Sequence, residues 1–103
     1  MPAGAVTIPR VRPVSEQDTE LEPLYRVIIH NDDVTPMDFV IHVLTTIFLL
    51  PAINAGQVML TAHIHGTAYV QTLPKEEARK RINSAHFAAA FKNLPLHFSM
   101  EPE

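Results

Sequence analysis

The chain has 103 residues, enough for one domain, and its 47% hydrophobic and 18% charged residues support a buried core and argue against global disorder. With the histidines neutral its net charge is −3, so overall charge does not attract it to nucleic acid or to an anionic membrane. It contains no cysteine, which excludes disulfides, thiolate catalysis and cysteine-based zinc sites.

The sequence contains no recognisable targeting or membrane segment. Its first residues, MPAGAVTIPRVRP, lack the apolar core of a signal peptide, and polar residues interrupt the longest apolar run, residues 37–55. Residues 1–23 hold several prolines and an acidic stretch, so we expect a flexible Pro-rich extension ahead of one core domain over residues 24–103. We expect a cytoplasmic monomer that binds neither membrane nor nucleic acid.

The core domain is predicted to begin with a strand and a turn. LYRVIIH, residues 24–30, is rich in β-branched and aromatic residues, and NDDV after it is turn material because Asn and Asp side chains bond their own backbone. A helix follows, with Thr35 as the expected N-cap, Pro36 at the first helical position and Asp38 placed for a capping box.

Four further elements complete the predicted domain. Pro51 starts a second helix that runs to about His63, and Gly66 ends this region. A strand, a long helix and a final strand follow over residues 67–73, 74–93 and 94–100. The order β-α-α-β-α-β predicts a small α/β sandwich, a three-stranded antiparallel sheet with three helices on one face.

The acidic pair Asp32 and Asp33 has two interpretations. Paired carboxylates could serve acid–base chemistry or bind a metal, but a solvated turn that favours the dipole of the next helix is the simpler one. A hard-metal site needs more oxygen ligands, and Asp38 is the only further acid nearby. No nucleophile, base and orienting group follow from the spacing, so we expect no enzymatic activity and no cofactor.

The histidine pair His63 and His65 allows a test for a metal site. An i, i+2 pair shares a face only on a strand, and this pair lies where a helix is predicted to end. The spacing therefore disfavours zinc or copper. A small metal-dependent hydrolase that uses this pair with Asp32 and Asp33 remains an alternative.

The basic cluster of Arg79, Lys80 and Arg81 also has two interpretations. It can be a solvated helix face whose charges pair with Glu76 and Glu77 four residues earlier, or a patch that docks another protein. Nucleic acid is disfavoured because no aromatic platform accompanies the charge.

Five apolar residues from separate elements can be core residues or the walls of a cleft: Met37, Val40, Met59, Ala62 and Leu96. Two of them are methionines close to a polar turn. Methionines suit a preformed apolar cleft because thioethers adapt their shape to a ligand.

Longer motifs carry a resemblance to a known family. LYRVIIHNDDVTPMDFVIHVL, then QVMLTAHIHGTA, EEA and LPLHFSME, resemble the ClpS family of ATP-dependent Clp protease adaptors over about residues 24–101. The resemblance implies the same α/β sandwich, a fold shared with the C-terminal domain of the ribosomal stalk protein. It also implies an adaptor without catalysis. Such an adaptor would bind substrates whose N-terminal residue, the N-degron, is Phe, Tyr, Trp or Leu, and deliver them to the N-terminal domain of a ClpA-like AAA+ unfoldase.

The resemblance also implies roles for individual residues. The substrate α-amino group would be bound by Asn31, Asp32 and His63, and Met37 would be a gate against β-branched side chains. The unfoldase would engage the N-terminal extension and dock on Glu76 and Arg81. A protein-interaction module of the stalk type, without N-degron binding, remains the alternative. The pocket for the substrate side chain would be formed by Asp33, Thr35, Pro36, Met37, Val40, Met59, Ala62 and Leu96, with Ala62 where the family commonly has valine.

Overall fold

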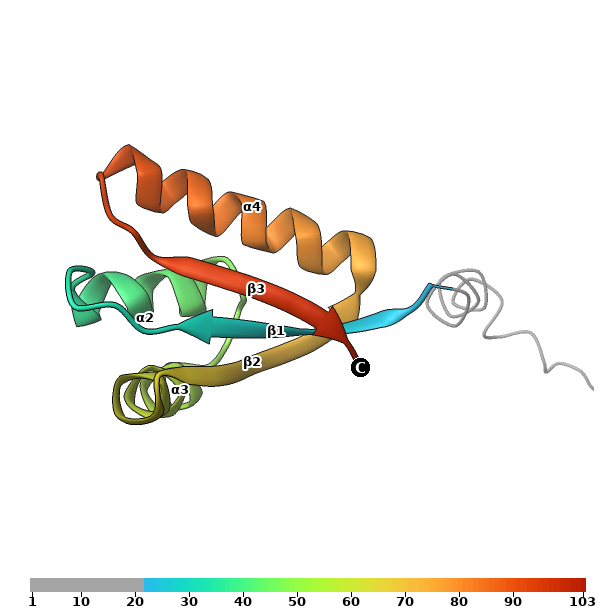
Figure 1. Ribbon diagram of the computed structural model, residues 1–103, viewed down its shortest axis with the longest axis horizontal. Coiled ribbons are helices and arrows are strands. Elements are labelled where there is room, and N and C mark those ends of the chain that lie inside the picture. Colours follow the sequence, from blue (N-terminus) through green and yellow to red (C-terminus); the bar gives the residue numbers. More distant parts are fainter. Residues whose placement is uncertain (1–21) are drawn as a thin grey trace, which may run out of the picture.

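The computed structural model describes residues 22–103 and has the predicted order of elements (Figure 1). The expected extension falls almost entirely on residues 1–21, which lie outside the described residues. No helix within the described part of the chain is both long enough and apolar enough to cross a bilayer. The elements are β1 (Leu24–His30), α2 (Met37–Thr46), α3 (Ala52–His65), β2 (Thr67–Pro74), α4 (Lys75–Phe91) and β3 (His97–Pro102).

The three strands form one antiparallel sheet in the order β2-β1-β3. β1 has the predicted bounds and lies in the centre, so its last residue, His30, pairs with Thr67 on one side and with His97 on the other. The register between β1 and β2 shifts directly after Val27, where Val70 of β2 has no partner opposite. This bulge increases the local twist of the strand pair.

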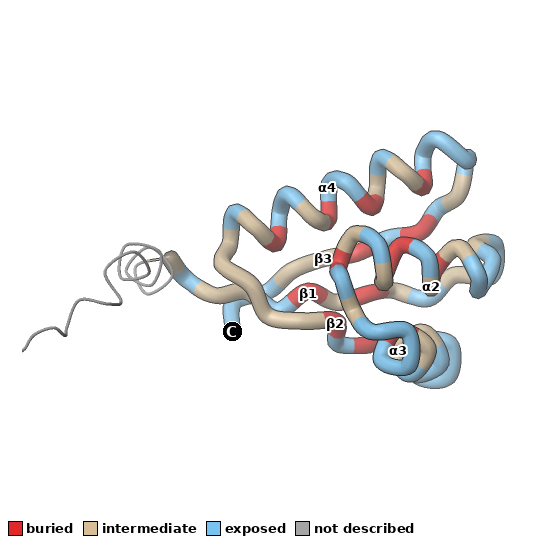
Figure 2. The backbone as a smooth tube through the Cα atoms, turned by 180° about the vertical axis from the view of Figure 1, so that it is seen from behind, coloured by how far each residue is buried: buried red, intermediate tan, exposed pale blue. Residues whose placement is uncertain are grey.

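All three helices lie on one face of the sheet, as predicted. In β1, Val27 and Ile29 are buried whereas Arg26 is exposed, the alternation expected when one face is covered. Figure 2 shows the same arrangement for α4, whose buried positions point to the sheet and whose outer side is exposed. The largest fully buried side chains are Phe48, Phe98, Ile29, Leu44, Val27 and Val43.

The start of α2 differs from the prediction. The helix begins at Met37 after Pro36, which is extended, and no side chain within residues 22–103 caps its first N–H groups. Thr35 is not the N-cap because its hydroxyl donates to Asp32 Oδ2 at 2.9 Å. The capping box with Asp38 is therefore wrong as well. A local side-chain turn has taken the polar groups that the helix start was expected to use.

The last strand begins later than predicted. After α4, Asn93 has a positive φ of 58°, and the N–H of Leu94 donates to the carbonyl of Ala89 at 2.9 Å, so these residues end the helix. Pro95 has no N–H to donate, and strand pairing begins two residues after it. Leu96 lies between the proline and the strand and is buried in the core.

Candidate functional site

A single carboxylate organises the turn after β1. Asp32 Oδ1 accepts hydrogen bonds from the backbone N–H of Val34 at 2.8 Å and of Thr35 at 2.6 Å, and Oδ2 accepts one from the Thr35 hydroxyl at 2.9 Å. Partial burial alone would raise the pKa of Asp32, but these hydrogen bonds together lower the pKa below its usual 3.8. The ionised side chain therefore holds the turn in one shape.

The turn is also fixed to the end of α3. The N–H of Asn31 donates to the Gly66 carbonyl at 2.9 Å, and the N–H of Gly66 donates to the Ala62 carbonyl at 2.8 Å. Gly66 has a φ of 93°, in the left-handed region that favours glycine, and it ends α3 after His65, two residues beyond the predicted end. This contact places the strand end and the last turn of α3, with His63, around one space.

That space is a cavity of about 170 Å³ between the acidic turn, α2 and α3. An apolar cavity of about 150 Å³ in another protein binds benzene, so this one has room for an aromatic or branched aliphatic side chain. The cavity is lined by Ile29, His30, Asn31, Asp32, Asp33, Thr35, Met37, Val40, Met59, Ala62, His63 and Leu96.

Every residue that the resemblance assigned to substrate binding lines this cavity, except Pro36. Pro36 lines a neighbouring groove with Phe39 and His42, and its carbonyl accepts the N–H of Phe39 in the first turn of α2. Sequence reasoning missed Ile29 and His30. Their place at the end of a strand directly before Asn31 was the available signal.

The cavity has apolar walls and a polar rim. Ile29, Val40 and Leu96 are buried among the walls, whereas Asp33 on the rim is exposed. The lining residues include two carboxylates and no Lys or Arg, and no ion pair within residues 22–103 involves Asp32 or Asp33. Negative potential therefore gathers at one end of an apolar space, an arrangement suited to a cation joined to an apolar group.

The structure does not assemble the metal site considered from the sequence. Within the described residues, no three His, Asp or Glu side chains are grouped so that they could hold a metal ion. His65 is exposed at the end of α3 and is not among the residues that line the cavity. Asp32 is already engaged by its own turn.

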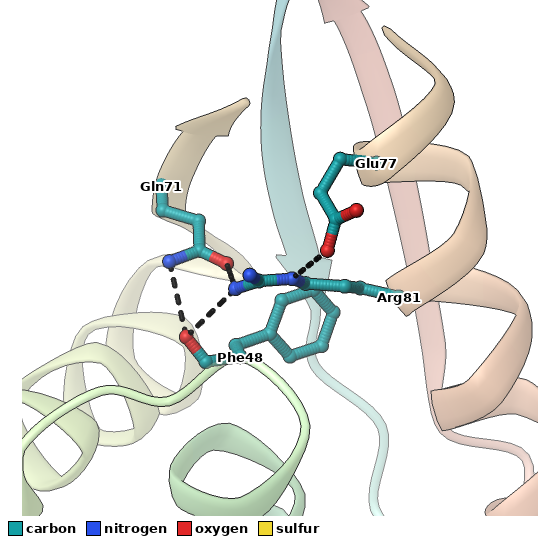
Figure 3. A network of polar contacts seen from close by, with 4 residues as sticks. All are labelled: Phe48, Gln71, Glu77 and Arg81. Atoms are coloured by element: carbon teal, nitrogen blue, oxygen red, sulfur yellow. Dashed lines mark hydrogen bonds and ion pairs between the residues drawn. The ribbon is translucent and has the colours of Figure 1, made fainter. Parts of the chain in front are cut away.

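A second polar cluster joins α4 to β2 and to the segment between α2 and α3 (Figure 3). Arg81 Nε donates to Glu77 Oε2 at 2.8 Å, and its Nη1 donates to Gln71 Oε1 at 3.2 Å and to the Phe48 carbonyl at 3.4 Å. Gln71 Nε2 donates to the same carbonyl at 3.1 Å. The hydrogen bond from Arg81 is the main cause that lowers the pKa of Glu77. The predicted Glu77–Arg81 pair is confirmed, and Arg81 is largely a structural residue.

Glu76 differs from Arg81 in this respect. It pairs with Arg79 at 3.0 Å, not with Lys80, so the expected pair with Lys80 is wrong. Both partners of the observed pair are more than half exposed, and such pairs contribute little to stability. Of the two residues expected to dock an unfoldase, Glu76 is on the surface and Arg81 is held inward.

A row of histidines runs from α4 to the edge of the cavity. His86 Nε2 accepts the N–H of Phe98 at 2.9 Å, its ring stacks on His97 with centroids 5.2 Å apart, and the rings of His97 and His30 are 5.0 Å apart. His30 Nε2 in turn forms a 2.7 Å hydrogen bond with Ser99 Oγ. Burial first, and the neighbouring His97 second, lower the pKa of His86. The Phe98 bond needs an unprotonated Nε2, and it also covers one N–H on the outer edge of β3.

Fold and site together define a small α/β binding domain in which a preformed cavity combines apolar walls with an acidic rim. Comparison with known proteins identifies its family. Residues 20–99 match the family described as "ATP-dependent Clp protease adaptor protein ClpS". The chain belongs to this ClpS family of Clp protease adaptors, which confirms the resemblance seen in the sequence.

Individual relatives agree with this assignment. The chain is 41% identical over 86 residues to the ATP-dependent Clp protease adapter protein ClpS of Syntrophus aciditrophicus, covering 82% of this chain and 80% of that protein. It is 41% identical over 85 residues to ClpS 2 of Mesorhizobium japonicum, with 82% and 84% covered. The solved structure of Agrobacterium tumefaciens ClpS2 bound to L-phenylalaninamide is similar with a TM-score of 0.76 and 35% identity, covering 80% of this chain and 99% of that one. The fold predicted from the sequence is thereby confirmed.

Proposed function

We propose that this protein is an adaptor that binds the N-terminal residue of substrates when that residue is Phe, Tyr, Trp or Leu. The observation that supports this most is the single cavity in which Asn31, Asp32 and His63 meet apolar walls. The phenylalaninamide bound by the Agrobacterium relative combines a free α-amino group with an aromatic side chain, the chemistry that such a cavity suits.

The α-amino group would be held at the polar rim. An α-ammonium has three N–H donors, and the acceptors available here are the Asn31 side-chain carbonyl, a backbone carbonyl near Asp32 and an unprotonated nitrogen of His63. Each hydrogen bond to a charged group contributes about 1.5–3 kcal/mol.

The substrate side chain would fill the apolar part of the cavity. Burial of a Leu or Phe side chain contributes about 1.5–3 kcal/mol. With the rim contacts added and the entropy of association subtracted, the dissociation constant is on the order of micromolar, which permits release and transfer. Met37 is half exposed at the mouth and would disfavour side chains branched at Cβ. The other side-chain contacts would come from Asp33, Thr35, Val40, Met59, Ala62 and Leu96.

Delivery completes the proposed activity. A ClpA-like AAA+ unfoldase would take the substrate through its N-terminal domain, docking at Glu76 and engaging the N-terminal extension. Arg81 would support the docking surface through the contacts that hold α4 against β2. The adaptor would act in the cytoplasm. It would need no cofactor and would catalyse no reaction, because it only recognises the substrate and transfers it.

Fluorescence anisotropy with peptides that differ only in their first residue tests the proposal. We expect Phe, Tyr, Trp and Leu peptides to bind and a Val peptide to bind at least tenfold more weakly. An N-acetylated Phe peptide lacks the charge and donors that Asn31 and His63 would hold, so equal binding of this control contradicts the proposal. If Asn31→Ala retains full affinity for the Phe peptide, the stalk-type interaction module becomes the better explanation.

A further inference from the structure

α3 exposes larger apolar side chains than it buries. Its buried residues are Ala55 and Ala62, whereas Ile53, Leu60 and Ile64 are 73%, 52% and 64% exposed. At about 100° per residue, the three exposed side chains fall within about 40° of one another and about 180° from the two alanines. A helix on the surface of a monomer normally has the reverse arrangement. The three residues are called the α3 stripe below.

The α3 stripe lies in a region without formal charge. No Asp, Glu, Lys or Arg occurs between Asp38 and Lys75, so no charged side chain interrupts the stripe along the helix. Gly56 lies beside the stripe, and nothing stands within 4 Å of the position that a Cβ would take there. Another backbone could therefore approach closely at this point. Three large aliphatic side chains exposed along one side of a helix, with no charged residue beside them, point to an interaction site.

We propose that the α3 stripe is the interface of a reversible homodimer, in which α3 packs antiparallel against α3 of a second copy. Homodimer interfaces are the most apolar class and are depleted in charge, as this face is. A two-fold axis brings like residues close together, so any charge near it would face its own copy. Antiparallel packing centred between Val58 and Met59 places Ile53 opposite Ile64 of the second copy, and the same contact occurs twice.

The size of the contact sets its strength. α3 has 14 residues and is about 21 Å long at about 1.5 Å per residue. A contact confined to one such helix buries less than the roughly 1,200 Å² of a standard interface, so we expect a dissociation constant on the order of 10–100 μM. This differs from the monomer expected from the sequence, because composition does not show which aliphatic side chains a fold leaves exposed.

The dimer would leave both binding cavities open. The cavity residues of α3 are Met59, Ala62 and His63, and they lie about 80–180° around the helix from the centre of the stripe. The two copies together would present two cavities on one assembly, and a substrate oligomer with several free N-termini would bind more tightly than a single chain. The dimer itself does not depend on the proposed N-degron binding.

Sedimentation equilibrium of the full chain without peptide, from about 5 to 500 μM, tests the proposal across the expected dissociation constant. The average mass should rise with concentration from 11.5 kDa toward twice that value. Leu60→Glu puts a carboxylate in the middle of the stripe and should raise the dissociation constant at least tenfold. Phe87→Glu is the matched control, since Phe87 is 75% exposed on the outer side of α4. Circular dichroism and thermal melts check that both variants fold.

The proposal is overturned if the wild type stays at 11.5 kDa throughout, if Leu60→Glu associates like the wild type, or if Phe87→Glu abolishes association equally. A wild type that stays monomeric but co-floats with neutral phosphatidylcholine vesicles would assign the stripe to lipid and overturn the dimer. If the wild type associates but does not bind the Phe peptide, only the proposed function is overturned and the dimer stands.

A second pair of variants tests the antiparallel arrangement. Ile64→Glu alone should weaken association, because the new carboxylate faces Ile53 of the second copy. The double variant with Ile53→Lys and Ile64→Glu should restore it, since each new ammonium then faces a new carboxylate. Parallel packing would oppose like charges, so a double variant that stays monomeric overturns the arrangement.

Discussion

Replacement of Asp32 separates the structural part of the acidic rim from its charge. Asp32→Ala removes the acceptor for two backbone N–H groups and one hydroxyl, at 2.6–2.9 Å. Loss of a capping side chain of this type costs about 0.5–2 kcal/mol, and with three bonds to a charged acceptor we expect about 2 kcal/mol. For a domain of this size the melting temperature should fall by roughly 8–16 °C.

Asp32→Asn is the informative comparison. Asparagine keeps an oxygen that accepts the N–H of Val34 and Thr35, and the two residue types cap about equally well, so we expect a loss below about 0.5 kcal/mol. Urea denaturation at neutral pH measures both variants, with Asp33→Ala as control because no hydrogen bond to the Asp33 side chain occurs within residues 22–103. Equal losses for Asp32→Asn and Asp32→Ala would refute the argument, since charge would then matter more than the hydrogen bonds.

The pH dependence of stability provides a second measurement on the same residue. The folded pKa of Asp32 is lowered from 3.8, so its contribution to stability is complete above that value and is lost as the pH falls through the lower folded pKa. Asp32→Asn should lack this part of the acid unfolding curve. Peptide affinity in the same variant should fall only a few-fold, because the turn keeps its shape and one nearby charge is lost.

Three further predictions concern residues away from this turn. Ala62→Val narrows the cavity, so a Trp peptide should lose roughly tenfold or more in affinity while the affinity of a Leu peptide changes little. Equal losses of affinity for the two peptides would contradict the role of Ala62 in size selection. Arg81→Ala leaves the Phe48 carbonyl with one donor, so the fold should lose about 1–3 kcal/mol of stability while peptide affinity stays unchanged. A variant that is as stable as the wild type in urea would show that the cluster is not structural. The folded pKa of His86 is lowered from 6.5, so its stabilisation is complete above 6.5 and decreases as the pH falls toward the folded value. His86→Gln still accepts a hydrogen bond but does not titrate, so its stability should vary less between about pH 5 and 7, and an unchanged slope would assign that slope to other groups.

Local patterns predicted the elements better than their ends. The strand over residues 24–30 was correct to the residue because β-branched alternation and the turn after it are both local properties. The start of α2 was wrong because Thr35 had two available roles, and the carboxylate of Asp32, three residues earlier, determined which it took. The start of the last strand was predicted three residues too early, because Leu94 still bonds to the end of α4 and β3 begins at His97.

The cavity lining followed from motif positions, whereas the contacts that support it did not. Arg81 and the Phe48 carbonyl are 33 positions apart, and His30 and Ser99 are 69 apart, so no spacing rule links either pair. The exposed stripe on α3 could not be predicted from the sequence for another reason. A helical period marks a side chain as apolar at regular intervals, but it does not say which of two opposite faces meets the sheet.

The fixed and the adaptable parts of the cavity imply different roles in recognition. Asn31 is tied through its backbone to Gly66, and Asp32 is bonded to its own turn, so the rim needs little reorganisation before it accepts an ammonium group. Met37 is half exposed, and Ala62 leaves space that a larger residue would fill. Requirement for a free α-amino group should therefore be strict and insensitive to substitutions at Met37 and Ala62. The choice among Phe, Tyr, Trp and Leu should instead change with each of these two residues, because they set the width and the mouth of the cavity.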